Sequence, residues 1–183
     1  MTSPGLATTM EGAAPTDPAA SGASAPTSSS FYLALRLLPP ERRTAMYAVY
    51  AFCRAVDDIA DNEGPRPERV AALDDWRRAI DALFAGHPAP ALGDLHTATR
   101  RYDLQRADFE ALIDGMAMDV TDDIVAPARA TFDRYVDRVA SAPGRLSARV
   151  FGLEPEAATR LAHHLGRRAL SPLLQITNIL RDV

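Results

Sequence analysis

The sequence predicts an all-α fold. Apolar side chains recur at steps of three and four residues along most of the chain, which is the period of a helix with one buried face. Proline and glycine stand between these segments, where helices begin and end. There is no sustained period-two alternation and no hairpin dipeptide between apolar runs, so no strand is expected. The chain has 183 residues, 47% of them hydrophobic, and one domain is the expectation.

The N-terminal segment, residues 1–27, consists mainly of Ala, Pro, Ser, Thr and Gly. This composition buries too little apolar surface to offset the entropy lost on ordering, so we expect a disordered tail. The pattern changes at residues 28–30, a run of three serines that offers an N-cap to a short helix. That helix would carry Phe31 and Leu35 on one side.

Two amphipathic helices are predicted next. The first begins at Pro40, a suitable first helical position, and ends at residues 62–65. The second runs from Arg66 to Gly86, a glycine typical of a helix stop, and its charged stretch at residues 74–78 predicts an exposed face. Their apolar residues are Met46, Val49, Cys53, Val56 and Ala60 in the first, and Val70, Leu73, Trp76, Ile80 and Leu83 in the second.

A weaker helix is predicted over residues 91–102, and another from Ala107 to about Asp123. Gly115 lies inside the latter, where it costs ~1 kcal/mol relative to alanine. Close packing or the close approach of a ligand should compensate for this cost. Asp119, four residues further on, is interpreted by itself as a surface residue.

The helical period continues from Thr131 to Gly152, but Pro143 and Gly144 are expected to kink or break that helix. A last segment starts near Pro155. Because Ser171-Pro172 looks like an N-cap followed by a first-turn proline, we expect one helix up to residue 170 and another over residues 172–183.

Composition excludes several classes of function. The net charge is −4, and all twenty basic residues are arginine, so no general basic field indicates nucleic-acid binding. A phosphate contact from a basic side chain would have to use a guanidinium, which matches phosphate oxygens bidentately. The only cysteine, Cys53, excludes an intramolecular disulfide, and its spacing indicates a core position. No run approaches the ~18 apolar residues of a membrane span, and we expect a cytoplasmic protein.

The stretch Tyr50–Asp61 carries the strongest chemical signal. Its carboxylates fall near a helix C-terminus, where the helix dipole costs each about 0.3–1 kcal/mol, so a positive partner is expected. Tyr50, Arg54, Asp57 and Asp61 follow one stripe beside the apolar face. One interpretation is a solvated acidic helix end paired with Arg54, and the other is a carboxylate pair that holds a divalent cation.

A second polar stripe near the C-terminus favours the metal site. Gln175, Asn178 and Asp182 share one face of a Leu/Ile-rich helix, and two such faces suggest one cavity. Carboxylates at i,i+4 suit Mg²⁺, which prefers to be completed by substrate phosphates. No GxSxG motif or Gly-rich phosphate loop is present. The residues therefore predict a helical cavity that binds a diphosphate through Mg²⁺ at its rim and a hydrocarbon beneath.

Five blocks in the same order resemble the squalene/phytoene synthases, which join two isoprenyl diphosphates head to head. The resemblance covers residues 28–183 and implies an isoprenoid-synthase-like helical bundle around a central cavity. Because the family's second motif continues past Val183, residues 28–183 are expected to be the N-terminal part of such a domain. The blocks are SSSFYLALRLLP, YAVYAFCRAVDDIAD, LIDGMAMDV, YVDRVASAPGRLSARVFG and QITNILRDV.

The resemblance also implies roles for individual residues. Asp57, Asp61 and Asp182 would bind Mg²⁺, and Tyr50, Tyr135 and Arg54 would be catalytic. The residues expected to bind or border the substrate are Ser28, Ser30, Phe31, Arg54, Gln175, Asn178 and Arg181.

The implied reaction is the Mg²⁺-dependent condensation of two farnesyl diphosphates to presqualene diphosphate, in the squalene/hopanoid pathway. Phytoene synthesis from geranylgeranyl diphosphate is one alternative, and a non-catalytic helical interaction fragment is another. A head-to-tail prenyltransferase or terpene cyclase agrees less well with the serine-rich opening and with QITNILRD. The expected partners are isoprenyl diphosphates and, for an apolar product, a peripheral membrane surface. The oligomeric state stays open.

Overall fold

The computed structural model describes residues 35–121 and 128–166, and within those ranges every regular element is a helix, which confirms the all-α prediction. A further helix at residues 155–166 follows the last named element. The named elements are α2 (Pro40–Asp61), α3 (Arg66–Phe84), the 3₁₀ turn η1 (Pro90–Leu92), α4 (Gly93–Tyr102), α5 (Arg106–Thr121), α6 (Arg129–Val136), the π-helical η2 (Asp137–Ser141) and α7 (Ala142–Val150).

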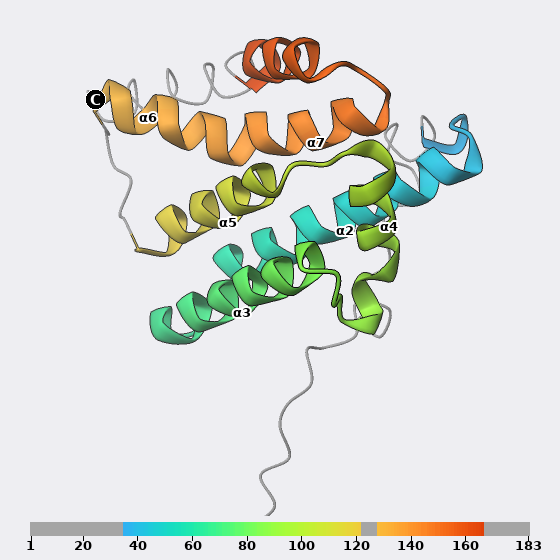
Figure 1. The fold of residues 1–183 in the computed structure, drawn as a ribbon. Coiled ribbons are helices and arrows are strands. Elements are labelled where there is room, and N and C mark those ends of the chain that lie inside the picture. The colour runs from blue at the N-terminus through green and yellow to red at the C-terminus, as the bar shows by residue number, and fades with distance from the viewer. Residues whose placement is uncertain (1–34, 122–127, 167–183) are drawn as a thin grey trace, which may run out of the picture.

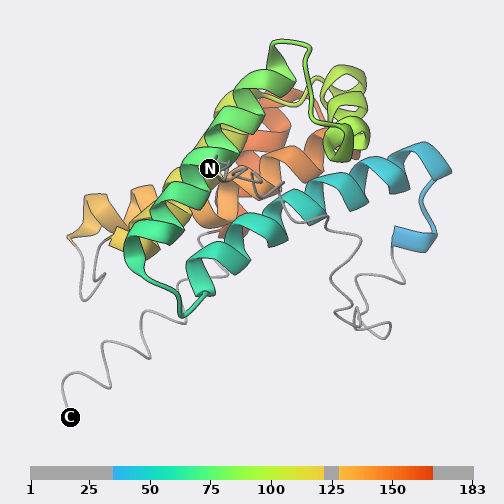
Figure 2. The same cartoon turned by 90° about the horizontal axis from the view of Figure 1, so that it is seen from below.

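The helices pack in tiers (Figure 1). α2 and α3 form the lower tier, α5 lies on both of them, and the rod made of α6, η2 and α7 lies on α5. Helix 155–166 lies on the outer side of α7, and α4 packs beside α2. Seen from below, α2 and α3 meet at their short connection and diverge from it (Figure 2).

The core lies between α2, α3 and α5. Phe52 of α2 makes edge-to-face contacts with Trp76 of α3 and Phe109 of α5, with ring centroids 5.5 and 5.0 Å apart. Phe84 extends this cluster from α3, 5.7 Å from Phe109. Around these rings lie fully buried aliphatic side chains that the helical period predicted, among them Val49, Val56, Leu73, Ile80 and Leu83.

The helix ends agree closely with the sequence. α2 begins at Pro40 and ends at Asp61, and α3 begins at Arg66. Gly86, the predicted stop of α3, has φ +87°, a left-handed conformation that favours glycine. The structure describes the short N-terminal helix only from Leu35 onward. The side chain of Leu35 is buried, as expected. Residues 1–34, 122–127 and 167–183 lie outside the described ranges, and so do the predictions made for them.

Pro143 and Gly144 do not break the helix, which was one of the two outcomes expected for them. η2 connects α6 to α7 without a break, and Pro143 falls in the first turn of α7. Just before it, the N–H of Ala142 donates to the carbonyl of Asp137, five residues back, in the π-helical pattern. The wider turn gives the proline ring room that a regular α-turn denies.

The charged stretch at residues 74–78 is only partly an exposed face. Arg78 pairs with Asp75 at the surface, as predicted. Arg77, in contrast, donates to Asp74 at 2.6 Å and reaches across to Asp114 of α5 at 2.8 Å, with its side chain 35% exposed. The arginine stem covers apolar surface while its guanidinium ties α3 to α5, which periodicity alone does not reveal.

Across the described ranges, no helix combines the length and the apolar character that crossing a bilayer requires.

Cys53 is partly buried and packs against the core, as predicted. Burial raises the pKa of its thiol to about 12.

Candidate active site

The C-terminal end of α2 presents Asp57, Asp58 and Asp61, as the sequence predicted. Arg54 supplies the expected positive charge, with Nη1 3.1 Å from Asp57 and Nη2 2.7 Å from Asp58. A second arginine, Arg69, binds the backbone at this helix end: its Nη1 donates to the Ala60 carbonyl at 2.9 Å. Two arginines thus offset the negative charge of this helix end.

The pKa of Asp57 is raised by burial and by nearby charges. Burial is the largest cause, followed by repulsion from Asp61, while Arg54 opposes both and Asp58 adds further repulsion. Among the described residues, no arginine forms an ion pair with Asp61. The pair of carboxylates on successive turns therefore keeps an excess of negative charge that a cation would relieve.

Asp119 of α5 and Tyr135 of α6 form a second polar group at this end of the molecule. The Tyr135 hydroxyl donates to Asp119 Oδ2 at 3.1 Å. Asp119 is exposed as a residue, but its carboxylate is partly desolvated, which raises its pKa. The tyrosine hydrogen bond opposes that shift, and the charges of Asp61 and Asp57 add to it. The pKa of Tyr135 is raised well above its ordinary range, first by burial and then by Asp119, with smaller contributions from Asp57 and Asp61.

These mutual effects show that four side chains from three helices lie close enough to influence one another's pKa: Asp57, Asp61, Asp119 and Tyr135.

Gly115 contributes to this arrangement. A Cβ on Gly115 would lie 2.8 Å from Val139 Cγ1 and 2.9 Å from Arg138 Cβ, so its absence lets α5 approach η2 closely. The predicted compensation for a mid-helix glycine is therefore close packing.

The structure gives positions for some of the predicted site residues. Arg54, Asp57 and Asp61 lie together on α2, and Tyr50 lies further back on the same helix, 40% exposed. Tyr135 approaches them from α6 through its bond to Asp119. The other predicted site residues, which include the whole second polar stripe, lie outside the described ranges: Ser28, Ser30, Phe31, Gln175, Asn178, Arg181 and Asp182.

Asp119 is exposed, which agrees with the prediction of a surface residue. What the sequence reasoning missed is its hydrogen bond with Tyr135 and its proximity to the acidic end of α2. The available signal was its place one turn after Gly115, which puts both residues on the side of α5 that faces the α6–η2 rod.

The residues fit a magnesium ion in their chemistry. Within the described ranges, no three His, Cys, Asp or Glu side chains are arranged as a complete metal site. Mg²⁺ does not need one, because it is commonly held by one or two carboxylates and completed by waters and substrate phosphates. Asp57 and Asp61 supply hard oxygen ligands, and the repulsion between them, which Arg54 offsets only in part, favours a cation between them.

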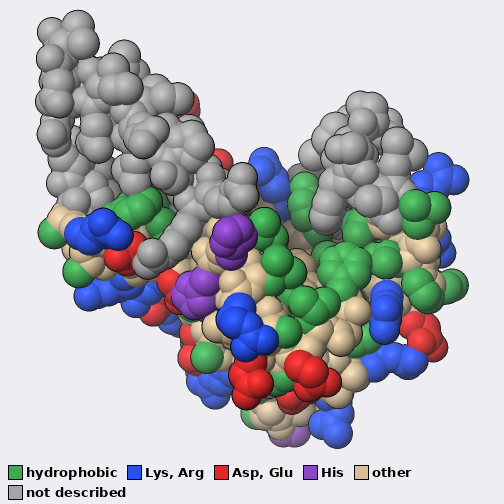
Figure 3. Space-filling model, turned by 90° about the horizontal axis from the view of Figure 1, so that it is seen from above, with side chains coloured by type: hydrophobic (Ala, Val, Ile, Leu, Met, Phe, Trp, Pro, Cys, Tyr) green, Lys and Arg blue, Asp and Glu red, His purple; other side chains and the backbone are tan. Residues whose placement is uncertain are grey.

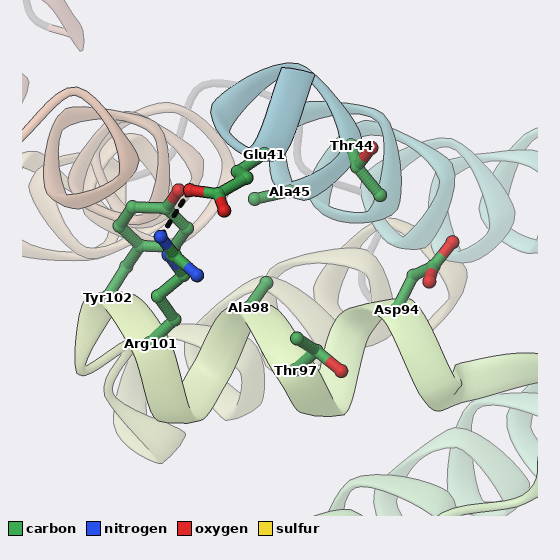
Figure 4. Close-up of a pocket in the computed structure, with 8 residues that line it drawn as sticks. All are labelled: Glu41, Thr44, Ala45, Asp94, Thr97, Ala98, Arg101 and Tyr102. Carbon is green, nitrogen blue, oxygen red and sulfur yellow. Dashed lines mark hydrogen bonds and ion pairs between the residues drawn. The ribbon is translucent and has the colours of Figure 1, made fainter. Parts of the chain in front are cut away.

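A shallow groove of about 210 Å³ lies elsewhere, between the start of α2 and α4 (Figure 4). Its lining includes Thr44, Thr97 and Tyr102, and an ion pair between Arg101 and Glu41 crosses it. Since it lies near the opposite end of α2 from Asp57 and Asp61, this groove is separate from the acidic group.

The squalene/phytoene synthase family model matches residues 25–183, nearly the whole chain after its first segment. The chain belongs to the squalene/phytoene synthase family. The match confirms the resemblance found in the sequence, and the family consists of enzymes that transfer prenyl groups.

Individual proteins of two branches of this family, and one solved structure, are similar to the chain to different degrees. The chain is 57% identical over 155 residues to presqualene diphosphate synthase of Rhodopseudomonas palustris, covering 85% of this chain and 54% of that protein. It is 38% identical over 164 residues to the chloroplastic phytoene synthase of Daucus carota, covering 84% and 39%. The crystal structure of squalene synthase HpnC from Alicyclobacillus acidocaldarius is similar with a TM-score of 0.64 and 31% identity, covering 73% of this chain and 50% of that one. The chain thus spans about half the length of the presqualene diphosphate synthase and of the HpnC structure.

Proposed function

We propose that the protein condenses two farnesyl diphosphates head to head to presqualene diphosphate, with Mg²⁺ as cofactor. The observation that carries the proposal is the carboxylate pair Asp57 and Asp61 on successive turns of α2, next to Arg54 and the Tyr135–Asp119 bond. Identities of 55–57% to three presqualene diphosphate synthases support this product.

In this proposal, Asp57 and Asp61 are the residues of α2 that would hold the metal. Arg54 lies one turn before Asp57 and offers a guanidinium fork to diphosphate oxygens. When bound, Mg²⁺ neutralises the charge that develops on the departing diphosphate. The C–O bond of the first substrate breaks with both electrons on the diphosphate and leaves an allylic cation. The double bond of the second substrate attacks this cation, and loss of a proton closes the cyclopropane.

Tyr50 and Tyr135 are proposed to border the reacting carbons. Ser28, Ser30, Phe31, Gln175, Asn178 and Arg181 are proposed to bind substrate, and Asp182 to ligate the metal from the second polar stripe. We further propose that residues 1–27 are a disordered tail and that residues 28–183 form the N-terminal part of an isoprenoid synthase domain. The coverage of about half of the relatives' length agrees with residues 28–183 being a part of such a domain.

Phytoene synthesis from geranylgeranyl diphosphate is the second candidate. Five phytoene synthases are identical to the chain at 35–38% of aligned residues, fewer than the 55–57% of the presqualene diphosphate synthases. Incubating the protein at its full gene-encoded length with each diphosphate and Mg²⁺ separates the two. Turnover of farnesyl diphosphate supports the proposal, and a clear preference for geranylgeranyl diphosphate would assign phytoene synthesis instead. A protein that turns over neither substrate would support the helical interaction fragment.

We also propose a cytoplasmic protein that contacts a membrane surface peripherally to release its product, whose hydrocarbon part is apolar. Hydrophobic side chains gather on the face seen from above (Figure 3). In helix 155–166, Leu161 and Leu165 are 43% and 56% exposed, one turn apart. Sedimentation with phospholipid vesicles tests this contact, with Leu161→Ser/Leu165→Ser as the variant expected to lose it. Equal vesicle binding by the variant and the wild type would contradict it.

A further inference from the structure

The Tyr135 hydroxyl has one proton, and it donates that proton in a hydrogen bond. It lies in the hydrogen bond to Asp119 Oδ2, with 3.1 Å between the oxygens. The two residues are 16 positions apart and come from α6 and α5, so the bond depends on how these helices pack. A phenol oxygen can donate once and accept from others. Toward every other neighbour, the Tyr135 oxygen is therefore an acceptor.

Burial and the neighbouring carboxylates keep the tyrosine protonated. Burial is the largest cause that raises the pKa of Tyr135, Asp119 is the next, and Asp57 and Asp61 add smaller contributions. Tyr135 stays protonated over the pH range in which enzymes are assayed. Asp119 is the group that fixes the direction of its proton.

We propose that Asp119 is a positioning residue for the condensation: by accepting the Tyr135 proton, it turns the lone pairs of the phenol oxygen toward the reacting allylic carbons. This inference rests on the proposed function, because it needs the allylic cation that diphosphate departure creates.

The hydrogen bond between Tyr135 and Asp119 would stabilise the allylic cation through the orientation of the phenol dipole. A neutral phenol that presents only lone pairs places the negative end of a dipole beside the positive carbon, without reorganisation during the reaction. A phenolate would instead attack the carbon and form an aryl ether. A phenol whose proton faced the substrate would oppose the developing charge. Asp119 prevents the last orientation, and the burial of the hydroxyl together with its hydrogen bond to Asp119 disfavours the phenolate.

Asp119 could act differently, as a third carboxylate ligand of the metal, and the experiment must separate the two roles. Asp119→Leu removes the acceptor, Asp119→Asn keeps an acceptor oxygen without the charge, and Tyr135→Phe removes the hydroxyl but keeps the ring. Asp75→Asn is the matched control, since Asp75 lies on the exposed side of α3 and pairs only with Arg78 among the described residues. All variants are made at the full gene-encoded length, together with the Tyr135→Phe/Asp119→Leu double variant.

Two readouts are compared: kcat and KM for farnesyl diphosphate, and the affinity for Mg²⁺ with inorganic diphosphate by titration calorimetry. Asp119→Leu is expected to lower kcat about a hundredfold, the scale of losing one preorganised dipole, with KM and diphosphate affinity unchanged. Asp119→Asn should recover part of this loss. The double variant should be no slower than Tyr135→Phe, because the two residues act as one unit. Circular dichroism and thermal unfolding confirm that each variant folds.

Three results would overturn the inference: an unchanged kcat in Asp119→Leu, additive losses in the double variant, or a loss of Mg²⁺–diphosphate affinity that makes Asp119 a ligand. Each of these leaves the proposed function standing as long as the wild type turns over farnesyl diphosphate. A wild type with no turnover of any prenyl diphosphate would overturn both.

Discussion

The Arg69 guanidinium of α3 donates a hydrogen bond to the Ala60 carbonyl of α2, with Nη1 2.9 Å from the oxygen. Ala60 stands beside Asp61 in the last turn of α2, where backbone carbonyls lack partners within the helix. One arginine thus satisfies a backbone acceptor and places positive charge beneath the acidic end of the helix. This contact holds the candidate metal-binding carboxylates against the neighbouring helix.

Removing the Arg69 guanidinium should destabilise the fold. Arg69→Met keeps much of the aliphatic stem but leaves the carbonyl unpaired, so we expect a loss of about 1.5–3 kcal/mol, the scale of a charged hydrogen bond. Urea unfolding measures the loss. The control is Arg78→Met, whose exposed pair with Asp75 should contribute less than about 1 kcal/mol. Equal unfolding midpoints for the two variants would contradict a special role for Arg69.

Asp57→Asn and Asp61→Asn should each lose Mg²⁺ affinity and keep the fold. Each substitution removes a charge that the helix dipole and the neighbouring carboxylate disfavour, so metal-free stability should be equal or higher by about 0.3–1 kcal/mol. Titration calorimetry with Mg²⁺ and inorganic diphosphate, beside thermal unfolding, measures both quantities. Loss of folding along with metal affinity would favour a purely structural acidic helix end.

Gly115→Ala is expected to destabilise the protein by about 1–3 kcal/mol, although alanine is the better helix former. The new Cβ would lie 2.8 Å from Val139 Cγ1, so α5 and η2 would have to move apart. Gly93→Ala in α4 is the matched control, because nothing lies within 4 Å of its Cβ position. Thermal unfolding should give a lower melting temperature for the first and an unchanged or higher one for the second. A stabilised Gly115→Ala would show that the helices tolerate separation.

Arg145 of α7 is the centre of a buried ionic group that joins α5, η2 and α7. Its Nε lies 2.6 Å from Asp108 and its Nη1 2.7 Å from Asp137, and its side chain is 14% exposed. Arg145→Met would leave a buried carboxylate without its cation, so we expect a loss of about 3–5 kcal/mol at neutral pH. Unfolding by urea measures it, with Arg129→Met as the exposed control.

The loss caused by Arg145→Met should depend on pH. Burial already raises the pKa of Asp108 and outweighs Arg145, while Asp137 adds repulsion and Arg149 opposes it. His163 lies 3.6 Å from Asp137 at the edge of this group. Without Arg145 the pKa of Asp108 rises further above its unfolded value, so the folded variant binds more protons and its stability falls as pH rises through that range. The difference from wild type should therefore be smaller near pH 4–5 than at pH 7, given an unfolded pKa of about 3.9. A difference independent of pH would mean that Asp108 is not the group left unpaired.

Local signals in the sequence predicted most of the described fold. Pro40 at a first helical turn, Gly86 at a stop and the four-residue apolar steps depend only on backbone geometry and one buried face, and they predicted α2 and α3 within two residues. Contacts between distant segments have no such local signature. Arg77 reaching Asp114, and Tyr135 reaching Asp119, depend on how the helices pack, which periodicity does not specify.

Pro143 illustrates a different limit. The rule that proline breaks a helix assumes a regular α-turn, whereas η2 widens the turn before it and keeps the rod continuous. For the site, the residues of α2 followed from spacing and charge, while Asp119 gave only the weak signal of its position after Gly115. The roles of all site residues stay predictions.

Product analysis tests most directly whether Asp57 and Asp61 serve a prenyl diphosphate condensation. The protein at full gene-encoded length is incubated with farnesyl diphosphate and Mg²⁺, without a nicotinamide cofactor, beside its Asp57→Asn variant. We predict one presqualene diphosphate and one diphosphate from every two substrates in the wild type, and turnover lower by about a hundredfold or more in the folded variant. Equal turnover by the variant, or a wild type that consumes no prenyl diphosphate, would contradict the proposed function of this acidic helix end.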